Sequence, residues 1–188
     1  MKKFLLILIL VSSIIFADEW QVEKTTKNSV QFISSTTLLD FEGNTTNIDG
    51  YLYWEGESMF ADKNELYFEV DLNSVKTGNA KRDRDMREEV LETDKFPTTH
   101  FKGTIIKFEE KEAGIYSVIT KGLFSLHGNK MEMEIPGDIT IKDGAMNIQT
   151  HFSVFLNEFD IEAPSLLAFI KVAEEIKLNL KFYLKKAE

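Results

Sequence analysis

The residues best suited to chemistry in this sequence are the charged side chains that follow Thr77-Gly78-Asn79. Arg82 and Asp83 come first, and basic and acidic residues then alternate through Arg84 and Asp85 to Arg87. Arginine binds carboxylate and phosphate groups well because its donors form a fixed fork. The same spacing also suits a surface helix with local ion pairs, each worth about 0.2–0.5 kcal/mol. The spacing favours the surface helix, and a polar binding site stays open as the alternative.

The rest of the sequence offers little for catalysis or metal binding. His100, His127 and His151 lie far apart at no metal-ligand spacing, so each is better interpreted as a structural or surface histidine. No nucleophile elbow, phosphate-binding loop, zinc-protease motif or dinucleotide fingerprint occurs. We therefore expect no catalytic residue, no metal and no cofactor, and we do not expect an enzyme.

The N-terminus predicts export. Lys2 and Lys3 precede an apolar run that is too short for a comfortable membrane span, and Ala17 offers a small residue for cleavage. We expect a signal peptide over residues 1–17 and a single mature domain over residues 18–188, with no membrane span after cleavage. An uncleaved anchor is the alternative. The sequence has no cysteine, which excludes disulfides, thiol chemistry and a lipid-anchored lipoprotein.

The composition also limits the partners. The chain carries a formal net charge of −9, which argues against nucleic acid and against electrostatic attachment to anionic lipid. A homodimer formed through a sheet edge or a helix stays open.

The hydrophobic pattern has a period of two along most of the chain, as in residues 66–72, 115–127, 146–154 and 176–184. Gly-containing turns separate these runs. About eight strands with one apolar face form an antiparallel sheet, and closure into a barrel is the simplest way to hide its edges. The exposed faces are charged, which excludes an outer-membrane barrel. The fold class is therefore mainly all-β, an eight-stranded antiparallel barrel with one or two short helices.

Three local features depart from regular strands. Ile105-Ile106 is out of step with its run, which predicts a β-bulge. Residues 83–92 predict a short helix with Met86 and Val90 on one face. Residues 163–173 are a second helix candidate, with Pro164 in a tolerated first-turn position and apolar residues almost all round.

Several separate motifs, which occur along the chain in the same order as in the family, resemble the YceI-like proteins. They are residues 74–79, Arg82-Asp83, Phe96-Pro97 with Phe101, Gly122-Leu-Phe-Ser-Leu-His-Gly128, Phe41-Glu-Gly43, and residues 49–54. The likeness covers essentially the whole mature chain. It departs from the family where Asp85-Met86 replaces a usual His-Leu pair and where Asn129-Lys130-Met131 replaces Val-Thr-Lys. A head group bound at either place could differ accordingly.

The resemblance implies an extended lipocalin-like barrel in the periplasm. It also implies a long apolar ligand in the lumen, a polyisoprenoid or an isoprenoid quinone-like molecule, held for storage or transport. The inward positions that we expect to line the lumen are Phe68, Val70, Leu72, Phe101, Phe124, Leu126, Ile148, Phe152, Val154, Leu178, Leu180 and Phe182. The residues expected near a head group are Thr77, Asn79, Arg82, Asp83 and His127.

Three other interpretations share this sequence pattern. The ligand could be a fatty acid or fatty amide, because apolar alternation does not distinguish one long chain from another. An enzyme that acts on an isoprenoid would need polar groups that converge inside the barrel. A barrel filled by its own side chains would have no cavity.

Overall fold

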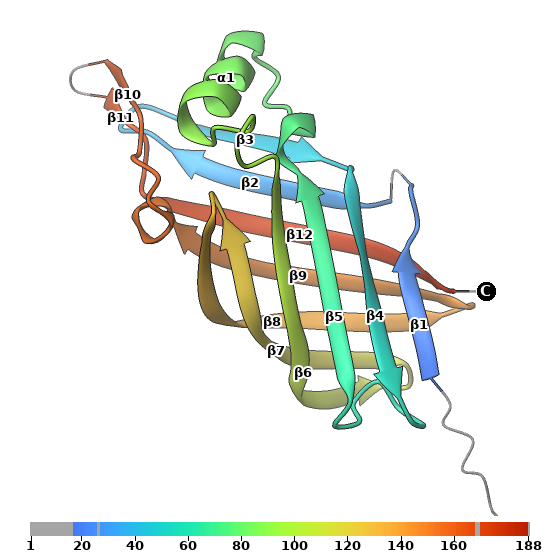
Figure 1. Ribbon diagram of the computed structural model, residues 1–188. Helices are drawn as coiled ribbons and strands as arrows, with labels where there is room; N and C mark the ends of the chain where they lie inside the picture. Colours follow the sequence, from blue (N-terminus) through green and yellow to red (C-terminus); the bar gives the residue numbers. More distant parts are fainter. Residues whose placement is uncertain (1–16, 26, 168–169, 188) are drawn as a thin grey trace, which may run out of the picture.

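The computed structural model describes residues 17–25, 27–167 and 170–187. Its main feature is a closed antiparallel barrel (Figure 1). Eight strands form the ring, in the order β1-β4-β5-β6-β7-β8-β9-β12, and β12 pairs back to β1. Their bounds are β1 Ala17–Val22, β4 Ile48–Glu55, β5 Asn64–Asp71, β6 Thr98–Glu112, β7 Ile115–Leu126, β8 Asn129–Lys142, β9 Ala145–Phe155 and β12 Glu175–Lys186. The predicted lipocalin-like barrel is confirmed.

A further hairpin extends the wall at one end. It consists of β2 (Ser29–Ser35) and β3 (Asp40–Thr45). The strand β2 pairs with the first half of β12 from Lys177↔Ile33 to Lys181↔Ser29, whereas β1 pairs with the last residues of β12. Two backbone hydrogen bonds of 2.9 Å between Asn44 and Lys76 join β3 to the segment that follows β5. The wall is therefore closed by β1 at one end and by β2–β3 at the other.

A single buried side chain bridges the break between β1 and β2. Asn28 is 1% exposed, and its Nδ2 donates to the carbonyl oxygen of Glu23 at 2.7 Å. Its Oδ1 accepts from the backbone N–H of Tyr183 on β12 at 2.8 Å. The asparagine thus replaces the ladder bonds that a continuous strand would supply.

Tight turns join the long strands. The β7–β8 turn contains His127 and Gly128 with φ of 52° and 78°, and the β8–β9 turn contains Asp143 and Gly144 with φ of 52° and 72°. Positive φ at both central residues matches the twist of an antiparallel hairpin and favours glycine at the second position. These turns fix the register of adjacent strands, so that every second side chain points into the barrel.

The predicted bulge in β6 is confirmed, since the pairing with β7 shifts register between Ile105 and Lys107. Asn64 is buried beside it. Its Oδ1 accepts from the backbone N–H of Ile105 at 2.7 Å, and its Nδ2 donates to the Ile105 carbonyl oxygen at 3.3 Å. The side chain thus satisfies backbone groups that the irregular ladder would otherwise leave unpaired.

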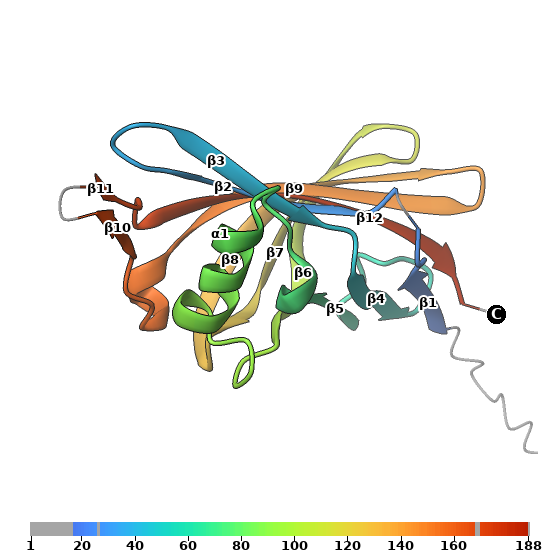
Figure 2. The ribbon, with the colours of Figure 1, turned by 90° about the horizontal axis from the view of Figure 1, so that it is seen from above.

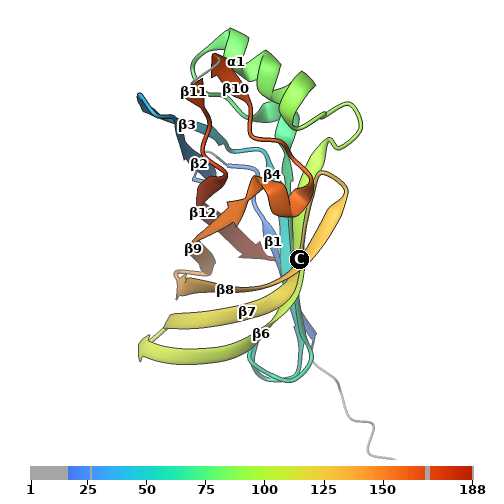
Figure 3. The ribbon, with the colours of Figure 1, turned by 90° about the vertical axis from the view of Figure 1, so that its left-hand side faces the viewer.

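Helical segments and the β2–β3 hairpin gather at one end of the barrel. In Figures 1 and 3 this is the upper end, and it also carries the small β10–β11 sheet. The helix α1 lies between β10–β11 on one side and strands β4 and β5 on the other (Figures 1 and 2). The short elements are η1 Leu72–Ser74, α1 Ala80–Asp85, η2 Met86–Val90, η3 Leu156–Phe159, β10 Ser165–Leu167 and β11 Ile170–Lys171.

The helix predicted over residues 83–92 is present but begins earlier. The side-chain oxygen of Asn79 accepts from the backbone N–H of Arg82 at 3.1 Å, and this cap starts α1 at Ala80. After Asp85 the chain continues as a π-helical turn, in which the N–H of Leu91 donates to the Met86 carbonyl oxygen at 2.8 Å.

The helix predicted over residues 163–173 is wrong. The strands β10 and β11 pair antiparallel, and beyond them Val172 forms a bridge with Thr36. The N–H of Ala173 donates to the Ser35 carbonyl oxygen at 2.8 Å. Val172 and Ala173 thus continue, as extended chain, the pairing that β12 makes with the same side of β2. A run that is apolar all round does not distinguish a buried helix from a strand.

The predicted signal peptide lies outside the described residues except for Ala17, the first residue of β1. Within the described part of the chain, no helix is long and apolar enough to cross a membrane.

Candidate functional site: an apolar cavity open at one end

The barrel encloses a cavity of about 620 Å³ below α1 and the β2–β3 hairpin. A smaller cavity of about 110 Å³ lies deeper in the barrel. Both are lined by a shared set of residues, Val30, Val70, Thr99, Phe124 and Leu178. The two spaces therefore adjoin and form one path from the upper end into the middle of the barrel.

All twelve residues predicted to line a lumen border these cavities. The deep cavity is lined by Phe68, Phe101, Ile148, Phe152, Leu180 and Phe182. The upper cavity is lined by Leu72, Leu126 and Val154, and both cavities by Val70, Phe124 and Leu178. The period of two found these positions because successive side chains of a strand point to opposite faces. That they contact a ligand stays a prediction.

The deep cavity presents no free hydroxyl group among the described residues. Thr99, Thr120 and Thr150 line it, and each donates its hydroxyl to a backbone carbonyl oxygen at 2.8, 3.0 and 2.6 Å. The remaining lining is aliphatic and aromatic, and the rings of Phe68 and Phe182 stack at 4.4 Å. This part of the barrel suits hydrocarbon rather than a polar group.

The barrel is filled beyond the deep cavity. Met146 and Leu184 face each other across β9 and β12 and have no exposed surface. Trp54 and Met59 are buried at the same end of the core. This end of the barrel is therefore filled, whereas the upper cavity reaches exposed residues such as Leu38 and Lys81 at the end that carries α1.

Of the five residues predicted near a head group, Asn79 and Arg82 line the upper cavity. The Arg82 guanidinium donates to the hydroxyl and to the carbonyl oxygen of Thr77, both at 2.9 Å. It also lies 4.9 Å from the centre of the Phe41 ring on β3. Arg82 thus connects α1 to the β2–β3 hairpin across the mouth of the cavity.

Thr77 and Asp83 brace the loop and lie outside the lining of either cavity. Asp83 is buried, and its Oδ1 accepts from the backbone N–H and the hydroxyl of Thr77 at 2.8 and 2.5 Å. Burial alone would raise the pKa of Asp83. The hydrogen bonds from Thr77 outweigh this effect, with help from Lys76 and Arg87, and lower the pKa below its ordinary value.

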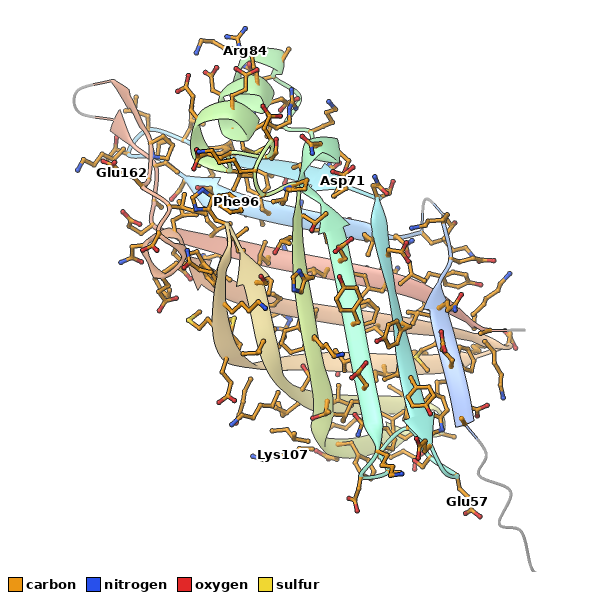
Figure 4. The ribbon with its side chains drawn as sticks, viewed as in Figure 1. Glu57, Asp71, Arg84, Phe96, Lys107 and Glu162 are labelled. Carbon is orange, nitrogen blue, oxygen red and sulfur yellow. The ribbon has the colours of Figure 1, made fainter. Side chains whose placement is uncertain are left out.

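The other charged side chains belong to the rim and the outer surface. Lys81 forms an ion pair with Asp85, and both residues line the upper cavity near its mouth, as does Glu89. Arg84 projects from α1 away from the barrel (Figure 4). The rim therefore carries both signs of charge, without an excess of cations.

His127 is a structural residue of the β7–β8 turn. Its Nε2 lies 3.1 Å from Glu92 Oε2, its Nδ1 lies 3.3 Å from the Phe159 carbonyl oxygen, and Phe96 packs on the ring at 4.5 Å. Phe96 is labelled at this end of the molecule in Figure 4. His127 thus joins three loops and lines neither cavity. The three histidines are spread over β6, β9 and this turn, and the described residues include no metal-binding cluster.

The sequence pattern does not predict the lining supplied by β2, β3, Pro164 and Val172. Phe32, Ser34, Leu38, Leu39, Phe41, Pro164 and Val172 all border the upper cavity. The alternation of Val30 and Phe32 does continue to Ser34, but a small polar residue at the third position resembles a strand end. Pro164 and Val172 lie in the segment for which the sequence predicts a helix, so their pattern does not indicate an inward face.

A closed antiparallel barrel with an apolar pocket defines a lipocalin-like barrel protein. The YceI-like domain model matches residues 20–184, and the chain belongs to this family. No functionally curated protein matches the sequence.

Solved structures agree with this fold. BcnA from Burkholderia cenocepacia is 15% identical, with a TM-score of 0.68 over 89% of this chain and 99% of that one. A polyisoprenoid-binding domain from Saccharophagus degradans, implicated in plant cell wall breakdown, is 15% identical, with a TM-score of 0.71 over 89% and 98%. The Campylobacter jejuni YCEI protein is 17% identical, with a TM-score of 0.58 over 78% and 85%.

Proposed function

We propose that this protein binds a long apolar lipid, a polyisoprenoid or an isoprenoid quinone-like molecule, in the barrel and stores or carries it in the periplasm. The observation that carries the proposal is the pair of adjoining apolar cavities, open at the end with α1 and closed at the other. The upper cavity, at about 620 Å³, lies within the range of about 300–1,000 Å³ typical of small-molecule sites. The similar domain from Saccharophagus degradans, described as polyisoprenoid-binding, supports the choice of ligand class.

Burial of the chain supplies the affinity. Each buried CH₂ contributes about 0.8 kcal/mol, so one prenyl unit of five carbons contributes roughly 3–4 kcal/mol before ordering costs. A few units therefore give tight binding in a lining that has no specific polar contact. Selection has to come from the length of the pocket and from its mouth.

The periplasmic location rests on the N-terminal sequence. Lys2 and Lys3 followed by an apolar run support export. A cysteine-free barrel needs no oxidation step to fold after export.

Direct binding measurements test the proposal. The delipidated protein is titrated with an isoprenoid quinone, a fatty acid and a fatty amide, with displacement of a fluorescent apolar probe as the signal. We expect saturable binding of the isoprenoid at one molecule per barrel, tighter than the other two. If only the fatty acid or the fatty amide binds, the ligand is of that class and not an isoprenoid. The absence of saturable binding to all three would overturn the proposal.

A further inference from the structure

Ser34 is a buried polar group without a partner in the upper cavity. It is 3% exposed, it lines that cavity, and its hydroxyl has no hydrogen-bond partner among the described residues. Leaving a buried hydroxyl unpaired costs about 1–3 kcal/mol. Native proteins rarely keep such a group unless something else satisfies it.

The other polar side chains around the cavity are already paired or exposed. The Thr99 hydroxyl donates to Ser125, and the Thr36 hydroxyl donates to the Leu39 carbonyl oxygen at 3.0 Å. Two further buried polar atoms without partners, on Trp54 and Arg87, belong to residues outside both linings. Within the described chain, Ser34 is therefore the one buried lining residue with a free hydrogen-bonding group.

The position of Ser34 suits the polar end of a chain that enters from α1. It lies on β2 between Phe32 and Thr36, opposite Phe41 on β3, and on the part of the wall that belongs to the upper cavity alone. The deep cavity has no free hydroxyl of its own, so the tail belongs there and the head remains near β2. The Ser34 side chain has three staggered rotamers, so the direction of its hydroxyl can change without movement of the backbone.

The surroundings favour a head group without charge. Arg82 and Lys81 are the cations of the lining, and they are held by Thr77 and Asp85, while Asp85 and Glu89 add negative charge. A buried anion without a free cation is far more costly than a hydroxyl or carbonyl group. A serine hydroxyl can donate to a carbonyl or accept from an alcohol.

We propose that Ser34 hydrogen-bonds a neutral polar head group, such as an alcohol or a quinone carbonyl, and so selects neutral isoprenoid lipids over bare hydrocarbons and over isoprenoid phosphates. This inference rests on the proposed lipid-binding function. Ser34 would then distinguish one head group from another, which the apolar lining cannot do.

The test compares an isoprenoid alcohol, its phosphate ester and the matching hydrocarbon on wild type, Ser34→Ala, Ser34→Thr and Ser117→Ala. Wild type is expected to bind the alcohol most tightly. Ser34→Ala should reduce the preference for the alcohol over the hydrocarbon by about tenfold, which corresponds to about 1.4 kcal/mol. Ser34→Thr, which keeps a hydroxyl, should retain the preference. Ser117→Ala, which removes an exposed hydroxyl paired with Asp138 outside both cavities, should also retain it.

The outcomes separate the two proposals. If wild type binds none of the three lipids, the lipid-binding function fails. If wild type binds them but Ser34→Ala leaves the preference unchanged, as expected for a hydroxyl satisfied by water alone, the role of Ser34 is overturned. Tighter binding of the phosphate than of the alcohol overturns the neutral head group.

Discussion

At the scale of single residues, buried polar side chains act where the strand ladder is interrupted. Asn28 spans the break between β1 and β2, and Asn64 satisfies the β6 bulge. Asp83 holds the loop before α1 through Thr77. Each side chain replaces a backbone partner that regular structure would provide. Removal of any of them would leave a buried polar group without a hydrogen-bond partner.

Replacement of Asn28 tests the bridge between β1 and β2. Asn28→Ala leaves the Tyr183 N–H and the Glu23 carbonyl oxygen without their side-chain partner, so we expect a loss of about 1–3 kcal/mol in the free energy of unfolding. Denaturant unfolding measures it. Asn179→Ala, on the outer face of β12, removes only an exposed bond to Gln31 and should change stability by about 0.5 kcal/mol or less. Equal losses in the two variants would contradict the assigned role.

The carboxylate of Asp83 makes a pH-dependent contribution. Because its pKa is lowered in the folded protein, its contribution is complete above the ordinary Asp pKa of about 4 and is lost as the pH falls through the folded pKa. We expect Asp83→Ala to destabilise by about 1–3 kcal/mol at neutral pH. The difference in the free energy of unfolding between wild type and Asp83→Ala, measured in urea, should become smaller below pH about 4. A gap that stays constant with pH would show that packing alone, rather than the charge, stabilises the loop.

At the scale of elements, the mouth of the cavity lies between the β2–β3 hairpin and the α1–η2 segment. Both supply lining residues, and Arg82 of α1 covers Phe41 of β3. A lipid chain that enters from this end has to pass between them. The junction of the two cavities, at Leu178 and its neighbours, then sets how far the chain reaches.

A disulfide that locks β3 to the segment before α1 tests whether these elements separate to admit lipid. Asn44 and Lys76 form a pair with both backbone hydrogen bonds at 2.9 Å, a geometry with Cα atoms about 5.5 Å apart that a disulfide can span. The sequence has no cysteine to interfere. We expect Asn44→Cys with Lys76→Cys to exchange lipid several-fold more slowly when oxidised, and to recover on reduction. Equal exchange rates in both redox states would place the entrance elsewhere.

A larger side chain at the junction tests the role of length. Leu178→Trp should close the deep cavity and expel about one prenyl unit, which lowers the affinity for a long isoprenoid by about 100-fold. Affinity for a short isoprenoid that fits the upper cavity should stay the same. Leu123→Trp, at an exposed position on the outside of β7, is the matched control. Equal loss for short and long chains would contradict a two-part pocket.

The inward residues could be predicted because strand periodicity is rigid and each long strand carries its own pattern. The pairing of β2 with β12 could not be predicted, because its residues are far apart in the sequence: Gln31 and Asn179 are separated by 148 positions. Local preference does not predict the extended conformation of residues 163–173, because it depends on pairing: β10 pairs with β11, and Val172 and Ala173 bond to residues at the end of β2. Arg82 and Asp83 were identified as notable, but only the structure separates Arg82 at the mouth from Asp83 within the loop.

At the scale of the whole molecule, the barrel has two different halves. The half near Met146 and Leu184 is packed solid, while the half under α1 is hollow. Stability from the packed half allows the other half to keep an apolar cavity, which a fully packed barrel would not have. We therefore expect a stable barrel that gains further stability when lipid fills the hollow half.

That gain can be measured by thermal unfolding. Lipid that binds only the folded state, at about 100 times its Kd, should add about 2.7 kcal/mol. The melting temperature should rise with lipid concentration for wild type and rise less for Leu178→Trp with a long chain. A melting temperature that does not respond to lipid would indicate that the cavity does not take up the chain.

The most direct test of lipid binding is to identify what the protein carries. The protein is produced with its own N-terminus, purified without detergent, and analysed by native mass spectrometry and by lipid extraction. We expect one isoprenoid lipid with a neutral head group per barrel, released on unfolding. A protein that carries no lipid after this purification, and takes up none when isoprenoids are added, would contradict the account.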